Sequence, residues 1–525
     1  MASHREIKIK FRIDAGKAIG LRRSRWWQRL GPARRQSLHS TYFDTSDWQL
    51  HDSNISLRTR NDGKTIIQTI KMARSTCDAV SRDEWETLIP DPTPDPSLVI
   101  DPALPEAFRT LTSIDLRPVF EVDVQRETRC LESGPARIDI SSDEGVVRVG
   151  RKREGIHEVE LELLAGGVDE LFAQARRMSD LVDGRLHART RSDVGCALTR
   201  TDRPWSRAPR LKLAPGMTAA ESFQLIAHNS LEHLTANDDC ARLNLHVEGV
   251  HQCRIALRRL RSALKIYGPL VRRKPIEPIE EDVRWLGKIL GMARDLDVLQ
   301  IDLLEPAIAA LGEAAQLAPL LANLEARKAQ AYRQVREALD SARYRHFVIS
   351  LCALGYHDDL GKSGDGPTSF NQPLPDFASR ALSRTHEKLL KRGQGFETLS
   401  KTQRHEVRIA LKKLRYAVDF FAAVFDEERK SKFFKKLARL QEDLGGMNDV
   451  VVAEGMLARL TGVSEGDGAP PIAPAMSQGK LVFAAGSILG WHRRRAVEID
   501  IRVIKDWHSF VQAKPFWLRE QAAAA

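Results

Sequence analysis

Two patterns of apolar and polar residues divide the chain near residue 200. Before this point, charged and apolar residues alternate, as in residues 6–13 (EIKIKFRI) and 157–163 (HEVELEL). A period of two is typical of β-strands that bury one face. We expect further strands at residues 55–60, 66–71, 82–88, 120–129 and 137–140.

Turn signals separate these segments, notably Asn61-Asp62-Gly63 and Asp143-Glu144-Gly145. Asparagine, aspartate and glycine favour the backbone conformations that tight turns require. Many short strands joined by such turns predict an antiparallel barrel or sandwich.

The three prolines in residues 199–216 (TRTDRPWSRAPRLKLAPG) interrupt the alternation and mark a domain boundary. From Thr218 onward, apolar residues recur at helical spacing, which predicts long amphipathic helices. Loops rich in Gly, Pro and Ser are expected near residues 358–376 and 462–479. The predicted organisation is an N-terminal domain, a linker and a helical domain at residues 1–200, 201–215 and 216–520.

An internal repeat lies within the helical part. Residues 251–261 (HQCRIALRRLR) recur as 405–415 (HEVRIALKKLR), at an offset of 154. Residues 286–295 (LGKILGMARD) recur as 440–449 (LQEDLGGMND) at the same offset of 154. A shared offset indicates that the helix–loop–helix geometry is duplicated, which predicts two similar halves about a pseudo-twofold axis.

Cationic residues follow one face of each repeated helix. Steps of three and four residues place them in stripes, the first roughly 21 Å long. The first stripe consists of His251, Arg254, Arg258, Arg261 and Lys265, and the second of His405, Arg408, Lys412 and Arg415. The opposite faces are apolar and should face a core. Like charges at these spacings repel each other, so each stripe is destabilising unless an anion or facing carboxylates neutralise it. A solvated helix face is the ordinary interpretation of such a stripe. The duplication of the stripe favours a bound linear polyanion instead.

The composition narrows the choice of polyanion. The chain has 81 Lys and Arg against 70 Asp and Glu, a formal charge of +11, and only 6% aromatic residues. Single-stranded nucleic acid sites usually interleave aromatic side chains for base stacking, and the basic stripes contain none. A phosphate chain without bases fits best, although duplex DNA or RNA contacted through its backbone stays open.

In the N-terminal part, the alternation places charged residues on shared strand faces. These sets are Glu6, Lys8, Lys10 and Arg12; Arg58 and Arg60; Arg82, Glu84 and Glu86; and Glu158, Glu160 and Glu162. Each set alone is typical of the solvated face of a sheet. In a closed barrel the same faces would point inward, where cations bind phosphate and carboxylates bind a hard metal such as Mg²⁺.

The helical part resembles the CHAD domain family over residues 216–518. The resemblance rests on HxxRxALRRLRSAL with LGMARDLDVL, on HxxRxALKKLRYAVDFF with LGGMNDV, and on a closing Gly490-Trp491 helix that ends in KPFW. It implies two antiparallel four-helix bundles whose basic faces bind inorganic polyphosphate through the two stripes. Arg294, Asp295, Asn448 and Asp449 also match motif positions, and we interpret them as groups that orient the stripes.

The N-terminal part resembles the CYTH family of triphosphate tunnel metalloenzymes over residues 5–198. The segments EIKIKF, TYFDTSDWQL, LRTR, QTIK, RDEWE, RPVFEVDVQR and EVELEL follow the family's order. Together, the two resemblances imply an α+β chain: an N-terminal antiparallel β-barrel with flanking helices that forms a triphosphate tunnel, and a C-terminal all-α domain of two pseudo-symmetric four-helix bundles.

The second resemblance also implies residue roles. The triphosphate would be bound by Lys8, Lys10, Arg58, Arg60, Lys71, Arg82, Arg126 and Arg191. Glu6, Glu158 and Glu160 are the implied ligands of Mg²⁺ or Mn²⁺, and with Lys10 they form the implied catalytic set. The implied reaction is metal-assisted attack of water on a terminal phosphorus.

Two residues depart from the family pattern. Lys8 stands where the family has a second glutamate, and Arg191 stands where it usually has a lysine. Arg191 preserves the charge. Lys8 replaces a carboxylate by an ammonium, which should weaken the binding of a divalent metal.

Three functions are compatible with these features. The first is a metal-dependent triphosphatase, and the second is a non-catalytic polyphosphate-binding protein, associated with polyphosphate granules, whose tunnel is degenerate. A cyclase acting on ATP ranks last, because no feature indicates a nucleobase pocket. Scattered cysteines without a CxxC pair and the lack of an apolar export segment predict a cytoplasmic protein. We expect no membrane and no specific nucleic acid as a partner, and the oligomeric state stays open.

Overall fold

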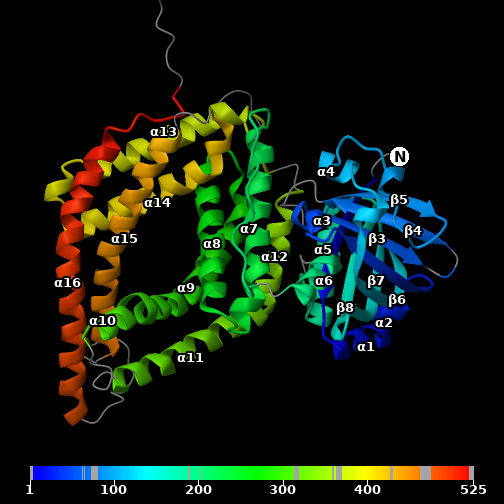
Figure 1. Ribbon diagram of the computed structural model, residues 1–525, viewed down its shortest axis with the longest axis horizontal. Coiled ribbons are helices and arrows are strands. Elements are labelled where there is room, and N and C mark those ends of the chain that lie inside the picture. The colour runs from blue at the N-terminus through cyan, green and yellow to red at the C-terminus, as the bar shows by residue number, and fades with distance from the viewer. Residues whose placement is uncertain are drawn as a thin grey trace, which may run out of the picture. The chain divides into compact units, whose positions relative to one another are not determined.

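The computed structural model describes residues 4–61, 63, 65–72, 81–186, 190–200, 203–311, 318–356, 360–361, 369–425, 430–460 and 475–518. Two compact units make up the chain. Unit 1 contains Met1–Leu211, Ala227–Cys240 and Leu339–Asp358, and unit 2 contains Lys212–Ile226, Ala241–Ala338 and Asp359–Ala525. Unit 1 holds the strands, and unit 2 is helical (Figure 1). The predicted α+β class is confirmed, and the domain limits at 1–200, 201–215 and 216–520 stay a prediction.

Within the described residues, the strands of unit 1 form one nine-stranded sheet in the order β5-β4-β3-β2-β6-β7-β8-β1-β9. The strands are β1 (His4–Arg12), β2 (Arg34–Asp44), β3 (Ile55–Asn61), β4 (Ile66–Met72), β5 (Ser81–Ile89), β6 (Arg117–Ser133), β7 (Ala136–Val149), β8 (Lys152–Ala165) and β9 (Arg185–Leu186). All their pairings are antiparallel, as predicted. β1 pairs with β8 through residues 8–12 and with β5 through residues 4–7.

The turn predicted at Asp143-Glu144-Gly145 is wrong. β7 runs through these residues, and Gly145 lies opposite Val124 of β6. A Cβ atom on Gly145 would lie 2.0 Å from the carbonyl oxygen of Asp123, so glycine is there to let the two strands approach. The chain instead reverses at Gly134 and Gly150, whose φ angles are +56° and +55°.

One face of the sheet is apolar and covered by helices. Leu57, Ile70 and Trp85 lie in a buried cluster with Leu50 and Phe108, which belong to α3 (Gln49–Asp52) and α4 (Glu106–Arg109). Because successive side chains on a strand point to opposite faces, the charged neighbours of these residues point to the other face. The other α-helices before residue 200 are α1 (Ala15–Arg23), α2 (Arg25–Gln28), α5 (Val168–Val182) and α6 (Arg191–Thr199).

Two stretches of the helical sequence belong to unit 1. Arg185 of β9 forms ion pairs of 2.9 Å with Asp238 and with Asp239. The hydroxyl of Tyr344 donates a hydrogen bond of 2.9 Å to the same Asp238, which is buried. A buried carboxylate needs such partners, so these contacts hold residues 227–240 and 339–358 in unit 1.

The helices after the boundary are long, as predicted. They are α7 (Ala219–Arg242), α8 (Val247–Tyr267), α9 (Arg273–Val298), α10 (Glu305–Leu311), α11 (Ala318–Asp340), α12 (Ala342–Ala353), α13 (Leu374–Arg392), α14 (Lys401–Phe421), α15 (Lys430–Leu460) and α16 (Ala475–Val511). A π-helical segment, Leu299–Leu304, joins α9 to α10. None of the described helices is both long and apolar enough to cross a membrane.

The repeat is visible in the helix limits. α8 and α14 begin at Val247 and Lys401 and end at Tyr267 and Phe421, so both limits keep the offset of 154 residues. The faces predicted to be apolar are buried in both helices: Cys253, Leu257, Leu260, Leu264 and Tyr267 in the first, and Leu411, Leu414, Val418 and Phe421 in the second. Parts of both predicted loops lie outside the described residues, and α13 and α16 begin inside their predicted limits.

Candidate functional site

β6, β7, β8 and β1 carry charged residues on the face of the sheet opposite the apolar clusters, and their register brings these residues together. On β1, Lys8 and Lys10 lie opposite Glu162 and Glu160 of β8. Glu158 lies opposite Asp143 of β7, and Asp143 lies opposite Arg126 of β6. Directly opposed residues in a sheet have neighbouring side chains, so the register alone brings these charges together.

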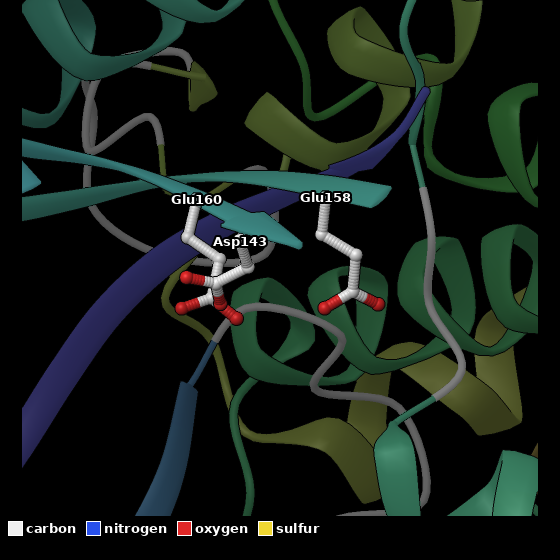
Figure 2. Close-up of side chains that lie close together, drawn as sticks. All are labelled: Asp143, Glu158 and Glu160. Atoms are coloured by element: carbon white, nitrogen blue, oxygen red, sulfur yellow. The ribbon is translucent and has the colours of Figure 1, made fainter. Parts of the chain in front are cut away.

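Asp143, Glu158 and Glu160 form a cluster of carboxylates, which we call the acid cluster. Each offers an oxygen atom, and these atoms all lie within 4.8 Å of one another. All three residues are buried, and Figure 2 shows their side chains projecting from β7 and β8 in the same direction. Three close carboxylates are stable away from water only when positive charge compensates them.

Two guanidinium groups supply part of that charge. Arg126 donates hydrogen bonds of 2.8 and 2.6 Å to the two oxygens of Asp143 and one of 2.6 Å to Glu160. Arg191 donates to Glu158 over 3.2 and 3.0 Å and is also ion-paired with Asp143. A planar guanidinium with several N–H donors can bridge carboxylates in this way.

Two lysines of β1 complete the compensation. The Nζ atom of Lys10 lies 3.1 Å from Oε1 of Glu158. The Nζ atom of Lys8 lies 3.4 Å from Glu162 and 3.9 Å from Glu160. Lys8, which was predicted to oppose metal binding, thus lies beside one carboxylate of the acid cluster.

Arg191 is held at the first turn of α6 by local structure. Thr190 caps the helix, because its side chain accepts a hydrogen bond from the backbone of Asp193 while the Asp193 side chain accepts one from the backbone of Thr190. A Cβ atom on Gly195 would lie 2.5 Å from the ring of Phe120. Glycine therefore seats α6 against β6, which positions Arg191 at the acid cluster.

A second group of charges lies on β3, β4 and β5. Lys71 is paired with Glu84 at 2.8 Å, and Arg60 is paired with Glu86 at 3.1 Å. Arg58 donates a hydrogen bond of 3.5 Å to the hydroxyl of Tyr42 on β2. Burial is the main cause that lowers the pKa of Arg60, and the nearby Arg58 acts in the same direction, whereas Glu86 and Glu84 oppose both.

The pKa values of the acid cluster depend on its cations. Burial alone would raise the pKa of Glu158, but Lys10 and Arg191 hold it below its ordinary value. Burial acts in the same direction on Glu160, whose pKa is nevertheless held well below its ordinary value by Arg126, Lys8, Arg191 and Lys10. Glu158 and Glu160 are therefore ionised near neutral pH, in the form that binds a metal or a cationic side chain.

The structure brings together most of the residues proposed from sequence. The residues that meet at the acid cluster are Lys8, Lys10, Arg126, Arg191, Glu158 and Glu160, whereas Arg58, Arg60 and Lys71 lie on β3 and β4. Glu6 and Arg82 are paired across β1 and β5, but their side chains lie outside the described part of the chain. Asp143, which shares a strand face with Asp139 and Ser141, is not among the site residues predicted from sequence, because Asp143-Glu144-Gly145 has the local pattern of a turn.

In unit 2, the two repeated helices contact each other. Nε and Nη2 of Arg258 on α8 donate hydrogen bonds of 2.8 and 2.6 Å to the hydroxyl of Tyr416 on α14. The guanidinium of Arg259 lies 5.8 Å from the ring centre of Phe420. The helices that carry the two predicted stripes are therefore side by side.

Cations from three helices gather at this contact. Burial lowers the pKa of Lys413 on α14, and so do Lys265 and Arg261 of α8 and Arg392 and Lys388 of α13. We call these five residues the basic cluster. Lys413, Lys388 and Arg392 were not predicted, because Lys413 lies off the stripe and α13 lies outside the repeated segments.

The other predicted cations of unit 2 have mixed surroundings. Arg415 is paired with Asp419 at 2.9 Å, and Arg254 lies 3.9 Å from Asp295. Arg408 and Lys412 are partly buried on α14, and His405 is exposed. The side chains of the remaining motif residues Asn448 and Asp449 lie outside the described residues.

Two family models match successive parts of the chain. Residues 4–186 match the model of the CYTH domain, and residues 225–458 match that of the CHAD domain. An inorganic triphosphatase of Haemophilus influenzae is 28% identical over 171 residues, which cover 32% of this chain and 47% of that protein. The chain thus spans about half of the length of this relative.

The solved structures that are similar to the chain include the following two. The CHAD domain of the plant Ricinus communis is 29% identical and has a TM-score of 0.49, with 58% of this chain and 97% of that chain covered. PptA from Streptomyces chartreusis is 15% identical, with a TM-score of 0.43 and coverage of 55% and 99%.

The surroundings of His251 on α8 generate a pH-dependent prediction. Burial lowers its pKa to about 4, helped by Arg294, Arg258 and Arg254 and opposed by Glu248. A bound anion would neutralise these arginines, so we expect polyphosphate to raise the pKa of His251 by about one unit or more. Binding then takes up a proton, and affinity increases as the pH falls toward the raised pKa.

Titration of the imidazole signals by NMR checks this expectation, with His251→Gln to assign the resonance. Unchanged titration of His251 in saturating polyphosphate would place the anion away from α8.

Proposed function

Because this chain carries a CYTH domain followed by a CHAD domain, we propose that it hydrolyses a triphosphate in the first domain and binds inorganic polyphosphate through the second. The proposed substrate is inorganic tripolyphosphate or another triphosphate, and the reaction depends on a divalent metal. The observation that carries the proposal is the acid cluster, surrounded by cations on one face of a sheet.

The acid cluster fits a hard divalent cation. Its donors are carboxylate oxygens, which Mg²⁺ and Mn²⁺ prefer, and the three donor atoms are close enough to share one ion. Asp143, Glu158 and Glu160 would hold the metal, and Glu6 on β1 is a further proposed ligand. When bound, the metal supplies Lewis-acid stabilisation of charge on the phosphate oxygens.

The cations on the same face would bind the substrate. We propose that the sheet encloses a tunnel, which the pairing of β1 with both β5 and β8 supports. Arg58, Arg60 and Lys71 would bind one end of the triphosphate, and Lys10, Arg126 and Arg191 the other. Fixing the chain in this way aligns its terminal phosphorus for attack by water, and breaking the terminal P–O–P bridge releases orthophosphate and pyrophosphate.

The helical part would bind longer chains. In the basic cluster, Lys413 experiences repulsion from four other cations. A polyphosphate carries repeated negative charge along its length and would convert this repulsion into attraction. The side-by-side placement of α8 and α14 supports a shared binding surface for Arg258, Arg261 and Lys265.

A second candidate function is polyphosphate binding without hydrolysis. It is favoured by Lys8, whose ammonium lies 3.9 Å from Glu160 and competes there with a divalent metal. The two functions differ in whether the acid cluster supports turnover.

The rate of phosphate release separates these functions. The wild-type protein should release phosphate from tripolyphosphate with Mg²⁺ or Mn²⁺, and Glu158→Gln should reduce the rate on the order of 100-fold by removing a donor of the acid cluster. Lys8→Glu should increase metal affinity. A colourimetric assay with tripolyphosphate, ATP and long polyphosphate as substrates measures the rate of phosphate release by the wild type and both variants.

Arg35→Gln is the matched control, because the Arg35 side chain is exposed and is paired with Glu127, which is not a member of the acid cluster. Phosphate release that appears only in Lys8→Glu would reject hydrolysis in the native protein in favour of binding alone.

A separate prediction concerns the basic cluster of the helical part. Arg261→Ala combined with Lys413→Ala should weaken binding of long polyphosphate by about tenfold or more and leave tripolyphosphate hydrolysis unchanged, since both residues lie in unit 2. Competition binding against duplex DNA of equal charge tests the preference for polyphosphate. Equal or tighter binding of the DNA would contradict the proposed ligand.

A further inference from the structure

The oxygens of the acid cluster are already engaged by two arginines. Arg126 contacts Asp143 and Glu160 through three hydrogen bonds of 2.6 to 2.8 Å. Arg191 contacts Glu158 at 3.0 Å and Glu160 at 3.6 Å, and it is also paired with Asp143. Each of the three carboxylates of the acid cluster is therefore bonded to at least one guanidinium.

The charge of the site leaves no excess of negative charge for a further cation. Three carboxylates of the acid cluster are contacted by four cationic side chains, namely Lys8, Lys10, Arg126 and Arg191. Lys8 also lies 3.4 Å from Glu162, so the four cations face four carboxylates and the balance is 4 − 4 = 0. A divalent cation that enters this arrangement therefore finds no net negative charge among these groups, and in a partly buried site its repulsion by the four cations is screened less than in water.

A bound phosphate chain would change both the bonding of the carboxylate oxygens and the net charge of the site. It brings negative charge, and its oxygens match the fork of a guanidinium as well as carboxylate oxygens do. Where Arg126 or Arg191 turns to a phosphate oxygen, the carboxylate that it leaves regains free lone pairs. The acid cluster then has both the vacant donors and the negative charge that a divalent cation requires.

We propose that Arg126 and Arg191 exchange partners between the acid cluster and the bound anion, so that phosphate and divalent metal increase each other's affinity. This inference rests on the proposed function, because it concerns the same triphosphate site. It adds an order of binding at that site: the metal binds weakly until an oxyanion is bound. By linkage, the metal strengthens anion binding by the same factor.

Binding of Mn²⁺ to the full chain tests the exchange directly. Loss of the free-ion signal in electron paramagnetic resonance gives the affinity, and sulfate serves as an oxyanion that complexes Mn²⁺ only weakly in water. We expect sulfate to tighten Mn²⁺ binding by about tenfold or more. Asp143→Asn identifies which part of the signal belongs to the acid cluster.

Variants of Arg191 separate the exchange from a simple effect of charge. Arg191→Gln should bind Mn²⁺ more tightly than wild type without sulfate and should lose most of the response to sulfate. Arg191→Lys keeps the charge but bridges fewer carboxylates, so it should be intermediate and gives a second variant where glutamine at position 191 prevents folding. Arg35→Gln is the matched control and should behave as wild type.

The wild-type titration alone is decisive. Equal Mn²⁺ affinity with and without sulfate overturns the inference, as does an Arg191→Gln protein that folds and binds Mn²⁺ no more tightly than wild type. Failure here is distinct from failure of the proposed function. Phosphate release without coupling would retain the triphosphatase and reject the exchange. Coupling without phosphate release would retain the exchange and reject the triphosphatase.

Discussion

Charges that leave water must be compensated inside the protein, and this constraint governs both parts of the chain. In unit 1, β1, β6, β7 and β8 place carboxylates and cations in register, and each charge of the acid cluster has partners of opposite sign. In unit 2, the basic cluster gathers five cations from three helices. Repulsion within that cluster costs stability unless an anion is bound.

The two parts of the chain compensate their charges in different ways, and this difference fits ligands of different length. The sheet is self-compensated by buried ion pairs, which hold cations in fixed positions and suit a short anion of defined size. The helices present cations on extended faces, where a long chain can contact many of them without a fixed register. Local features support each arrangement, such as Gly195, which seats the helix that carries Arg191.

Much of this organisation was predictable from the sequence, because hydrophobic periodicity reports which face of an element is buried. The alternation predicted most strands and placed Glu158 and Glu160 on one face, and the repeat predicted α8 and α14. β2 was not among the predicted strands, since its first residues are polar and exposed. Asp143 was missed because a glycine that permits close strand approach has the same local pattern as a glycine in a turn.

Other parts depend on tertiary contacts that no local pattern encodes. Lys388 and Arg392 join the basic cluster only because α13 packs against α14. The hydrogen bonds between Arg258 and Tyr416 join residues 158 positions apart. Similarly, Arg191 meets Asp143 because α6 folds back on the sheet, and spacing alone does not predict that contact.

A crystal structure of the full chain with a non-hydrolysable triphosphate analogue would show directly which groups these arginines contact. We expect phosphate oxygens bonded to Arg58, Arg126 and Arg191, with Asp143 freed from at least one guanidinium. An analogue bound elsewhere, with Arg126 still on both oxygens of Asp143, would contradict it.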